Sequence, residues 1–315
     1  MSNILGIDVS KQKLDVALSI DQKIVRNCFD NSLKGFRQLQ KWLLSRDCKE
    51  VRVCLEATGV YGEKVAEFLY EKGHRVSVVN PLRIRRYAES RLERNKTDKA
   101  DARIIAEFCE KEDLKLWAPP SEEVKQLQSF TRRIEALEQM IVMEKNRFDS
   151  APKQIMPSIK RTIKSLENEI DEVKKLIKDH FNDHPGLKEQ KDLLETIPGI
   201  GEKTANMLLS EFDFARYETA RQIAAHAGVT PKRSQSGTTL DKTNLSRLGS
   251  ARIRKSLFFP AMVAKQHNEI VIEFARRLEE NGKSKMQIIC AVMRKLLHIA
   301  FGVLKHRRPF DPNLA

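Results

Sequence analysis

Residues 4 to 29 read ILGIDVSKQKLDVALSIDQKIVRNCF, and this stretch decides the fold of the first part of the chain. It contains three apolar runs of strand character, Ile4 to Val9, Leu14 to Ile20 and Ile24 to Phe29, separated by short polar segments. Connections this short are typical of antiparallel hairpins. We therefore predict that the chain begins with a three-stranded antiparallel meander.

The pattern after the meander alternates between helix and strand. Helix, strand, helix, strand and helix are predicted over residues 32–45, 51–55, 60–71, 75–79 and from 81 onward. Three meander strands followed by this alternation is the order of a ribonuclease-H-like (RuvC-like) domain, an α/β fold. In that fold the first and fourth strands are neighbours at the centre of the sheet, so Asp8 and Glu56, at the ends of these strands, would lie side by side.

Two further carboxylates are candidates for the same place. Asp98 and Asp101 are three residues apart on a predicted helix, so they share one face and could jointly hold a divalent cation. Together with Asp8 and Glu56 they predict a site for Mg²⁺ or Mn²⁺ that serves phosphate chemistry. Asp15, in the second strand, is the acidic residue most easily mistaken for a member of this set.

The composition indicates a helix-rich globular protein with a polyanionic partner. The 315 residues carry a net charge of +14, and 41% of them are hydrophobic and 6% aromatic. A basic balance of this size favours binding to nucleic acid.

The cysteines and the apolar segments indicate a cytoplasmic location. Five cysteines are scattered without a C-x-x-C pair, which is typical of reduced thiols rather than disulfides or zinc ligands. The first residues do not resemble a secretory signal. The apolar stretch from Ile288 to Leu304 is interrupted by Arg294, Lys295 and His298, so we predict a buried helix and no membrane span.

Heptad spacing of apolar residues marks the middle of the chain, residues 121–184. Two helices separated near Pro152 and Pro157 would form a hairpin. Their apolar stripes could be buried against each other, or they could pair with another subunit.

We therefore predict three domains: the meander domain (residues 1–120), the helical hairpin (residues 121–184) and a last domain (residues 185–315). The last domain is predicted to be mostly helical. The run Ile197-Pro198-Gly199-Ile200-Gly201-Glu202-Lys203 has the spacing of a helix-hairpin-helix element, in which glycines let backbone N–H groups approach a phosphate. Residues 232–237 are predicted to form an exposed polar loop with hydroxyl groups and two cations. The candidate DNA-binding residues are Gly199, Gly201, Lys203, Lys232, Arg233, Arg247, Arg252, Arg254 and Lys255.

Four runs in the first part carry a family resemblance. They are Gly6-Ile7-Asp8-Val9-Ser10-Lys11, Leu55-Glu56-Ala57-Thr58-Gly59-Val60-Tyr61, Asn80-Pro81 and Lys96-Thr97-Asp98-Lys99-Ala100-Asp101-Ala102. In this order and spacing they resemble the signature runs of the DEDD insertion-sequence transposases, recombinases with a RuvC-like domain that are guided by a bridge RNA. The later segments extend the resemblance over nearly the whole chain.

The resemblance implies a second, serine-bearing transposase domain. The family's nucleophilic serine precedes a glycine after a G-[LVI]-x-P break, and the matching residue is Ser236; Ser234 fits the local chemistry nearly as well. The basic run differs from the family's usual Ser-Lys-Arg-Gly, because here it is Ser246-Arg247-Leu248-Gly249. A serine needs activation to become a good nucleophile, and metal coordination is one route.

The implied activity is that of a DNA transposase. Such an enzyme excises and inserts an insertion sequence by cutting and rejoining donor and target duplexes, with a bridge RNA as guide, and it works as a dimer or tetramer. The carboxylates and the serine lie in different domains, so the complete site could be shared between subunits.

Three other interpretations stay open. A junction-resolving endonuclease would use the same carboxylates with water as the nucleophile. A sugar kinase or ATPase of the actin type is suggested by Gly6-Ile7-Asp8 alone, without the glycine-rich phosphate loops of that fold. A protein descended from a transposase could also bind RNA or DNA without catalysis.

Overall fold

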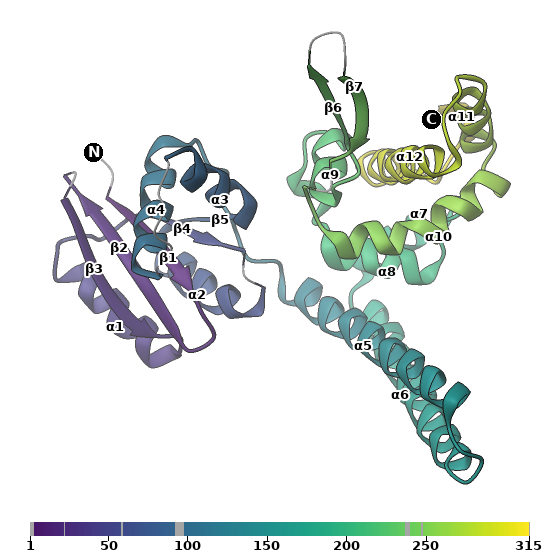
Figure 1. Ribbon diagram of the computed structural model, residues 1–315, viewed down its shortest axis with the longest axis horizontal. Helices are drawn as coiled ribbons and strands as arrows, with labels where there is room; N and C mark the ends of the chain where they lie inside the picture. Colours follow the sequence, from purple (N-terminus) through teal and green to yellow (C-terminus); the bar gives the residue numbers. More distant parts are fainter. Residues whose placement is uncertain are drawn as a thin grey trace. The chain divides into compact units, whose positions relative to one another are not determined.

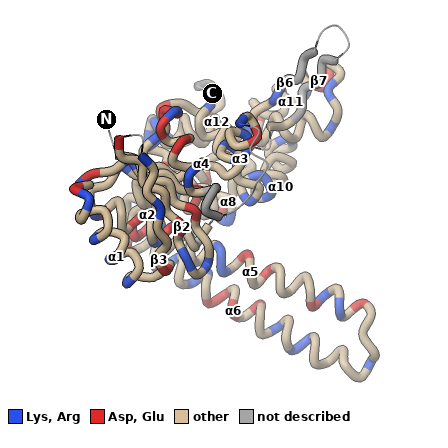
Figure 2. Tube along the Cα trace, turned by 60° about the vertical axis from the view of Figure 1, so that its left-hand side comes forward, with Lys and Arg blue, Asp and Glu red and all other residues tan. Residues whose placement is uncertain are grey.

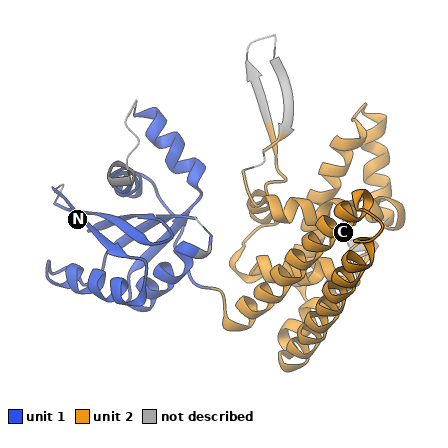
Figure 3. Cartoon of the chain, turned by 60° about the horizontal axis from the view of Figure 1, so that its bottom comes forward, with its two compact units in different colours: residues 1–119 blue, residues 120–315 orange. Residues whose placement is uncertain are grey.

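The computed structural model describes residues 3–21, 23–57, 59–91, 98–236, 240–246 and 248–314; the side chains of residues 60, 98–101, 233–236, 240–244 and 314 lie outside this description. The chain forms two compact units, residues 1–119 and 120–315 (Figure 3). Unit 1 is α/β and unit 2 is mainly helical. A further division of unit 2 at residue 184 stays a prediction.

Unit 1 is built on a five-stranded mixed sheet. Its strands are β1 (Ile4–Val9), β2 (Lys13–Ile20), β3 (Lys23–Asp30), β4 (Arg52–Glu56) and β5 (Arg75–Val79), in the order β3-β2-β1-β4-β5. β1, β2 and β3 pair antiparallel, which confirms the predicted meander. β4 lies parallel to β1 and β5 parallel to β4. The first and fourth strands are therefore neighbours, as the order of elements predicted.

Helices cover both faces of this sheet (Figure 1). They are α1 (Leu33–Leu44), α2 (Val60–Glu71), α3 (Pro81–Ser90) and α4 (Asp98–Lys111). Alternate residues of a strand point to opposite faces. Leu5 and Ile7 of β1 accordingly pack with Phe36 of α1, while Ile4 packs with Ile105 of α4. The residues of β1 that alternate with Leu5 and Ile7, including Gly6 and Asp8, thus belong to the α4 face.

A buried histidine fixes the edge of unit 1 where β4 and β5 begin. The backbone N–H of Val51 donates to His74 Nδ1 at 3.3 Å, so Nε2 carries the proton and donates to Gln40 Oε1 at 2.8 Å. Burial lowers the pKa of His74. The neutral imidazole therefore joins α1 to the starts of two strands.

The predicted hairpin opens unit 2. Its helices are α5 (Glu122–Ser150) and α6 (Met156–Asp183). Leu137 and Ile141 of α5 form a cluster with Ile170 and Val173 of α6, so the two stripes are buried against each other within one chain. Charges of both signs are interspersed along the outer faces (Figure 2).

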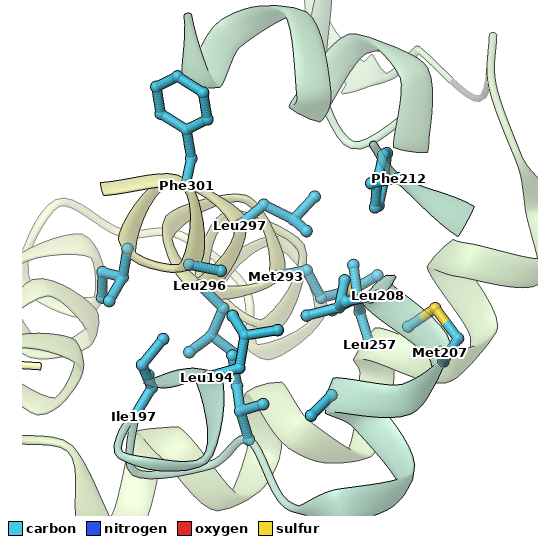
Figure 4. Close-up of a cluster of buried hydrophobic side chains, with 14 of the residues drawn as sticks. Leu194, Ile197, Met207, Leu208, Phe212, Leu257, Met293, Leu296, Leu297 and Phe301 are labelled. Carbon is cyan, nitrogen blue, oxygen red and sulfur yellow. The ribbon is translucent and has the colours of Figure 1, made fainter. Parts of the chain in front are cut away.

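The rest of unit 2 is a helical core. It contains α7 (Pro185–Glu195), α8 (Glu202–Glu211), α9 (Ala220–Ala227), α10 (Ala251–His267), α11 (Glu269–Glu280) and α12 (Lys285–His306). Leu194, Leu208 and Leu257 pack around Leu296 and Leu297 of the central α12 (Figure 4). The base of the hairpin belongs to the same core, since Leu127, Ile177 and Phe181 are members of this cluster.

Helix α12 is the predicted buried helix at 288–304. Among the described residues it is the one helix whose length and composition would suffice to cross a membrane, with a mean hydropathy of 1.6 over its most apolar window. Half of that window is buried inside the protein. The buried apolar residues of α12 pack in the core of unit 2.

A β-hairpin occupies the segment that we predicted to be a polar loop. β6 (Pro231–Ser236) pairs antiparallel with β7 (Leu240–Leu245), so the expected loop at 232–237 is wrong over its described part, residues 232–236. The two strands are joined by backbone hydrogen bonds, which do not require apolar side chains. The strand was not predicted because the sequence Lys232-Arg233-Ser234-Gln235-Ser236 has no alternation of apolar and polar residues.

Candidate functional site

Two of the four predicted carboxylate residues lie on neighbouring strands of unit 1. The parallel register pairs Ile4 with Arg52 and Ile7 with Leu55. Continuing it by one residue sets Asp8 beside Glu56. Both residues are half-buried and fall on the α4 face, because their positions alternate with Ile7 and Leu55, which pack on the opposite face.

Contacts along this face show that α4 runs antiparallel to β1 and β4. At the start of β4, Arg52 Nη2 donates to the carbonyl oxygens of Cys109 (3.0 Å) and Glu112 (3.3 Å), near the end of α4. Farther along the sheet, a β-carbon on Gly6 would lie 2.4 Å from backbone atoms of both Ala102 and Ala106. The absence of a side chain at Gly6 thus allows α4 to lie directly on β1.

This direction carries the start of α4 toward the carboxylate end of the strands. From Gly6 to Asp8 the strand rises about 6.6 Å, and from Ala102 back to Asp98 the helix rises about 6 Å. The backbone of the first turn of α4 is therefore expected at the level of Asp8. The side chains of Asp98 and Asp101, and the whole of Lys96 and Thr97, lie outside the described residues.

A pair of buried cysteines also joins the helix to the sheet. Cys54 of β4 donates a hydrogen bond to Cys109 of α4, and this bond together with burial raises the pKa of the Cys54 thiol. The thiol of Cys54 therefore stays protonated, and the buried pair packs α4 against β4. Both residues are at most 1% exposed.

The oxygen donors fit a hard divalent cation, as Mg²⁺ and Mn²⁺ prefer carboxylates. In the part of the chain whose side chains are described, no group of three or more histidine, cysteine, aspartate and glutamate residues gathers to hold a metal. Asp8 and Glu56 are two of the four residues that we predicted as ligands, and their role in metal binding stays a prediction. Asp15 lies directly opposite Asp8 in the β1–β2 register, but it is 6% exposed and paired with Lys13 at 3.2 Å.

Two asparagines, of which the sequence analysis singled out only Asn80, fix the loops beside this site. Asn31 Nδ2 donates to the carbonyl oxygens of Ser10 (2.8 Å) and Tyr61 (3.0 Å), which joins the loop after β1 to the start of α2. The signature Asn80 caps α3 by accepting from Leu82 N, with Pro81 in the first turn. Asn31 had no detectable signal, because asparagine at a strand end is typical of an ordinary turn.

In unit 2, Ser236 is the last described residue of β6 and its backbone pairs with Leu240. Ser234 lies two residues earlier, and its backbone lies opposite Lys242. Their side chains, and those of Arg233 and its neighbours on β7, lie outside the described residues. Lys232 is exposed near the base of the ribbon.

The base of the β6–β7 ribbon is closed by two glycines. Gly228 ends α9 with φ +69°, and a β-carbon on Gly249 would lie 2.4 Å from Gly228 N. Arg254, a predicted DNA-binding residue, donates from Nη1 to the carbonyl oxygens of Ala227 (3.3 Å) and Gly249 (3.0 Å). Arg254 therefore joins the segment that precedes β6 to the segment that follows β7.

An aromatic pair supports the same base. Tyr217 Oη and His226 Nδ1 form a hydrogen bond of 2.5 Å. Burial raises the pKa of Tyr217 to about 12 and lowers the pKa of His226. At neutral pH both side chains are therefore uncharged.

The predicted helix-hairpin-helix turn connects α7 and α8. Gly199 has φ +103°, and a β-carbon there would lie 2.6 Å from Ala264 Cβ of α10, so both conformation and packing require glycine. The buried Asn268 donates to Pro198 O at 3.3 Å and holds the turn. Gly201 begins α8 without a side-chain cap, and Lys203 is paired with Glu138 of α5 at 2.5 Å.

Arg252 is part of a network between α5, α8 and α10. Its guanidinium donates to Glu135 Oε2 at 2.8 Å, to Glu211 Oε1, and to Thr131 Oγ1 at 3.3 Å. Lys255, three residues along α10, is exposed. DNA contacts by both residues stay predictions, and Arg247 lies outside the described residues.

Comparisons with known proteins bear on most of the chain. A family model described as "Transposase" matches residues 5–157, and a model described as "Transposase IS116/IS110/IS902 family" matches residues 191–276. Pilin gene-inverting proteins from Moraxella bovis and Moraxella lacunata are each 34% identical over 316 residues, which cover 98% of both chains. An insertion element IS110 protein of Streptomyces coelicolor is 22% identical over 152 residues, 48% of this chain and 36% of its own.

Together with the mixed sheet and the helical second unit, these matches define a DNA transposase or recombinase. The chain belongs to the IS116/IS110/IS902 family of transposases, the insertion-sequence family that the signature runs predicted. Transposases act on DNA, and DEDD members commonly use a divalent metal ion.

Proposed function

We propose that this protein is a site-specific DNA recombinase that moves an insertion sequence by cutting and rejoining donor and target duplexes. Its fold in unit 1 would be ribonuclease-H-like, with Asp8, Glu56, Asp98 and Asp101 as the metal-binding quartet. The observation that carries the proposal is the side-by-side placement of Asp8 and Glu56 on the face that α4 covers.

The quartet would hold Mg²⁺ or Mn²⁺ through carboxylate oxygens. When bound, such an ion neutralises charge at the scissile phosphate and stabilises the leaving oxygen. The chain's own contribution is rigid positioning. Gly6, Arg52 and the Cys54–Cys109 pair fix α4 on the sheet, so the first turn of α4 is held against the strand ends.

Ser236 would be the nucleophile. Its Oγ forms a bond to the phosphorus, the bond from phosphorus to one strand oxygen breaks, and that oxygen takes up a proton. The phosphodiester energy is kept in the phosphoserine link, so a different strand can be joined by the reverse step without ATP. The place of Ser236 at the end of β6, away from the closed base of the ribbon, supports this role.

Nucleic acids of two kinds would be bound. Donor and target DNA would contact the turn at Gly199 and Gly201 and the basic residues Lys203, Lys232, Arg233, Arg247, Arg252, Arg254 and Lys255. A bridge RNA would supply specificity by base pairing, while the protein reads backbone and shape. The net charge of +14 supports a polyanionic partner. The names of the 34% identical relatives also suggest inversion of a DNA segment, which needs the same cutting and rejoining.

The test is to look for a covalent protein–DNA adduct. The full chain is combined with RNA transcribed from its native flanking DNA, donor and target duplexes and Mg²⁺, and the products are separated on a denaturing gel. We expect an adduct with the wild type and with Ser234→Ala, the matched control, and none with Ser236→Ala or Asp101→Ala.

Other outcomes would change the assignment. An adduct lost in Ser234→Ala and kept in Ser236→Ala would move the nucleophile by two residues. Cleaved DNA without adduct in the wild type and in Ser236→Ala would instead indicate an endonuclease that uses water. If neither the wild type nor any variant cuts the DNA that it binds, the protein is a nucleic-acid-binding protein without this activity, and the catalytic role is refuted.

A further inference from the structure

A group of positive charges lies on the face of α12 next to α9, outside every site described above. His298 lies four residues after Arg294 and three after Lys295, so both cations are its neighbours on the surface of α12. Helix α9 packs beside α12 (Figure 1), and Arg221 lies in its first turn. Arg294, Lys295 and His298 are half-buried and Arg221 is exposed.

These charges lack counterions among the residues that the structure describes. In the described part of the chain, Arg221, Arg294 and Lys295 form no ion pair or hydrogen bond through their side chains. By contrast, four cations of α5 and α6 are each paired with an acidic residue, namely Lys125, Arg147, Lys174 and Lys175. His298 Nε2 is closed off from solvent and has no hydrogen-bond partner. Buried polar atoms without a partner are uncommon in folded proteins and call for a ligand or another explanation.

The electrostatic surroundings of His298 agree with this picture. Burial lowers its pKa, and Arg294, Lys295 and Arg221 lower it further. The imidazole is therefore neutral, and if its proton is on Nε2 that atom is a donor without an acceptor. An anionic group at this surface would lie among the three cations that surround His298.

The arrangement of the helices is held by a contact at the far end of the same face. Lys305, one heptad beyond His298, donates from Nζ to the carbonyl oxygen of Glu218 at 3.1 Å. This bond fixes the segment before α9 against α12. It keeps Arg221 close to the α12 cations without using up any of them.

We propose that Arg221, Arg294, Lys295 and His298 form a binding site for a phosphate group of a nucleic-acid backbone. The site lies on α9 and α12, beyond the ribbon, the turn and the basic run to which the proposed function assigns DNA. Arginine suits this role because its planar donors match phosphate oxygens in pairs. The inference rests on nucleic-acid binding by the proposed function and is independent of its strand chemistry.

The test measures binding of the full chain by fluorescence anisotropy, without divalent ions, so that no cleavage takes place. The ligands are a labelled duplex DNA and a labelled single-stranded RNA, titrated over a range of salt concentrations. Each phosphate contact contributes about 0.9 to the slope of log K against log salt for duplex DNA and about 0.7 for a single strand. Losing one contact lowers DNA affinity about eightfold near 0.1 M salt.

We expect Arg294→Gln/Lys295→Gln to lower both the slope and the affinity by at least one such contact, for DNA, for RNA or for both. The ligand affected identifies the source of the phosphate. The matched control is Lys283→Gln/Lys285→Gln, which removes the same charge at exposed positions before and at the start of α12. Its slope should stay near that of the wild type.

Two results would overturn the proposal. The first is that the Arg294/Lys295 variant binds both ligands like the wild type. The second is that the Lys283/Lys285 control loses as much affinity as the Arg294/Lys295 variant, because the effect would then be one of net charge. Arg221→Gln, at an exposed position, repeats the test without disturbing the core, and circular dichroism confirms that each variant is folded. An unchanged slope in Arg221→Gln would remove that residue from the site, and with it the link to α9.

Discussion

Replacing Gly6 by alanine should separate α4 from the sheet. The new β-carbon would lie 2.4 Å from both the carbonyl oxygen of Ala102 and the amide nitrogen of Ala106, whereas ordinary contact begins at 3.4 Å. The helix must therefore move by about 1 Å, because backbone atoms have no other rotamer. We expect unit 1 to lose about 2–3 kcal/mol of unfolding free energy. A displacement of about 1 Å can lower a reaction rate about a hundredfold, so adduct formation should slow by that order.

The assay compares adduct formation by the wild type and Gly6→Ala at a temperature where both are folded, and hydrogen exchange reports the opening of α4. Gly302→Ala is the matched control. A β-carbon on Gly302 of α12 meets no atom within 4 Å, so this change should leave the rate unaltered and stabilise the helix by about 0.5–1 kcal/mol. Wild-type rates and exchange in Gly6→Ala would refute both the close packing of α4 and its role in placing the carboxylates.

Three further predictions concern charge and assembly. The pKa of His74 is lowered by burial, so below about pH 6.5 the unfolded chain binds the extra proton and unit 1 loses stability. The protection of the β4 and β5 amides, which is the intrinsic exchange rate at each pH relative to the observed rate, should therefore fall on acidification, and less so in His74→Gln. Arg252→Ala leaves two partly buried carboxylates unpaired and should cost about 2–4 kcal/mol in urea unfolding. By contrast Lys203→Ala removes an exposed pair worth less than about 1 kcal/mol, and equal losses would contradict the assigned network. If the site is shared between subunits, mixed Asp8→Ala and Ser236→Ala chains should recover adduct formation that neither shows alone; no recovery would indicate that each chain is complete.

The sheet of unit 1 followed from the sequence because its signals are local. Strands of alternating or continuous apolar character and short polar connections determined the antiparallel meander, and the later helix–strand alternation determined the parallel pair. The adjacency of Asp8 and Glu56 came with that order. The helical hairpin was also predicted, but spacing alone could not decide whether its stripes were buried within one chain or between chains.

The remaining features depend on contacts that spacing does not encode. The β6–β7 ribbon has no apolar alternation, so it was predicted as a loop. The role of Arg252 was predicted from its charge, whereas the carboxylates that surround it come from α5 and α8, more than forty residues away along the chain. Gly6 was recognised as part of a signature, but only the approach of α4 explains why no larger residue fits there.

The boundary between the two compact units does not coincide with the boundary of the family's first sequence model. That model extends to residue 157, past the end of α5, whereas α5 packs against α6 and the core of unit 2. In a chimera spliced at residue 157, α5 and α6 would come from different proteins. Leu137 and Ile141 would then have to pack against the α6 of another relative. Exchange of unit 1 and unit 2 between relatives, in evolution or by design, should therefore succeed at residues 119–120, where the splice leaves both cores intact.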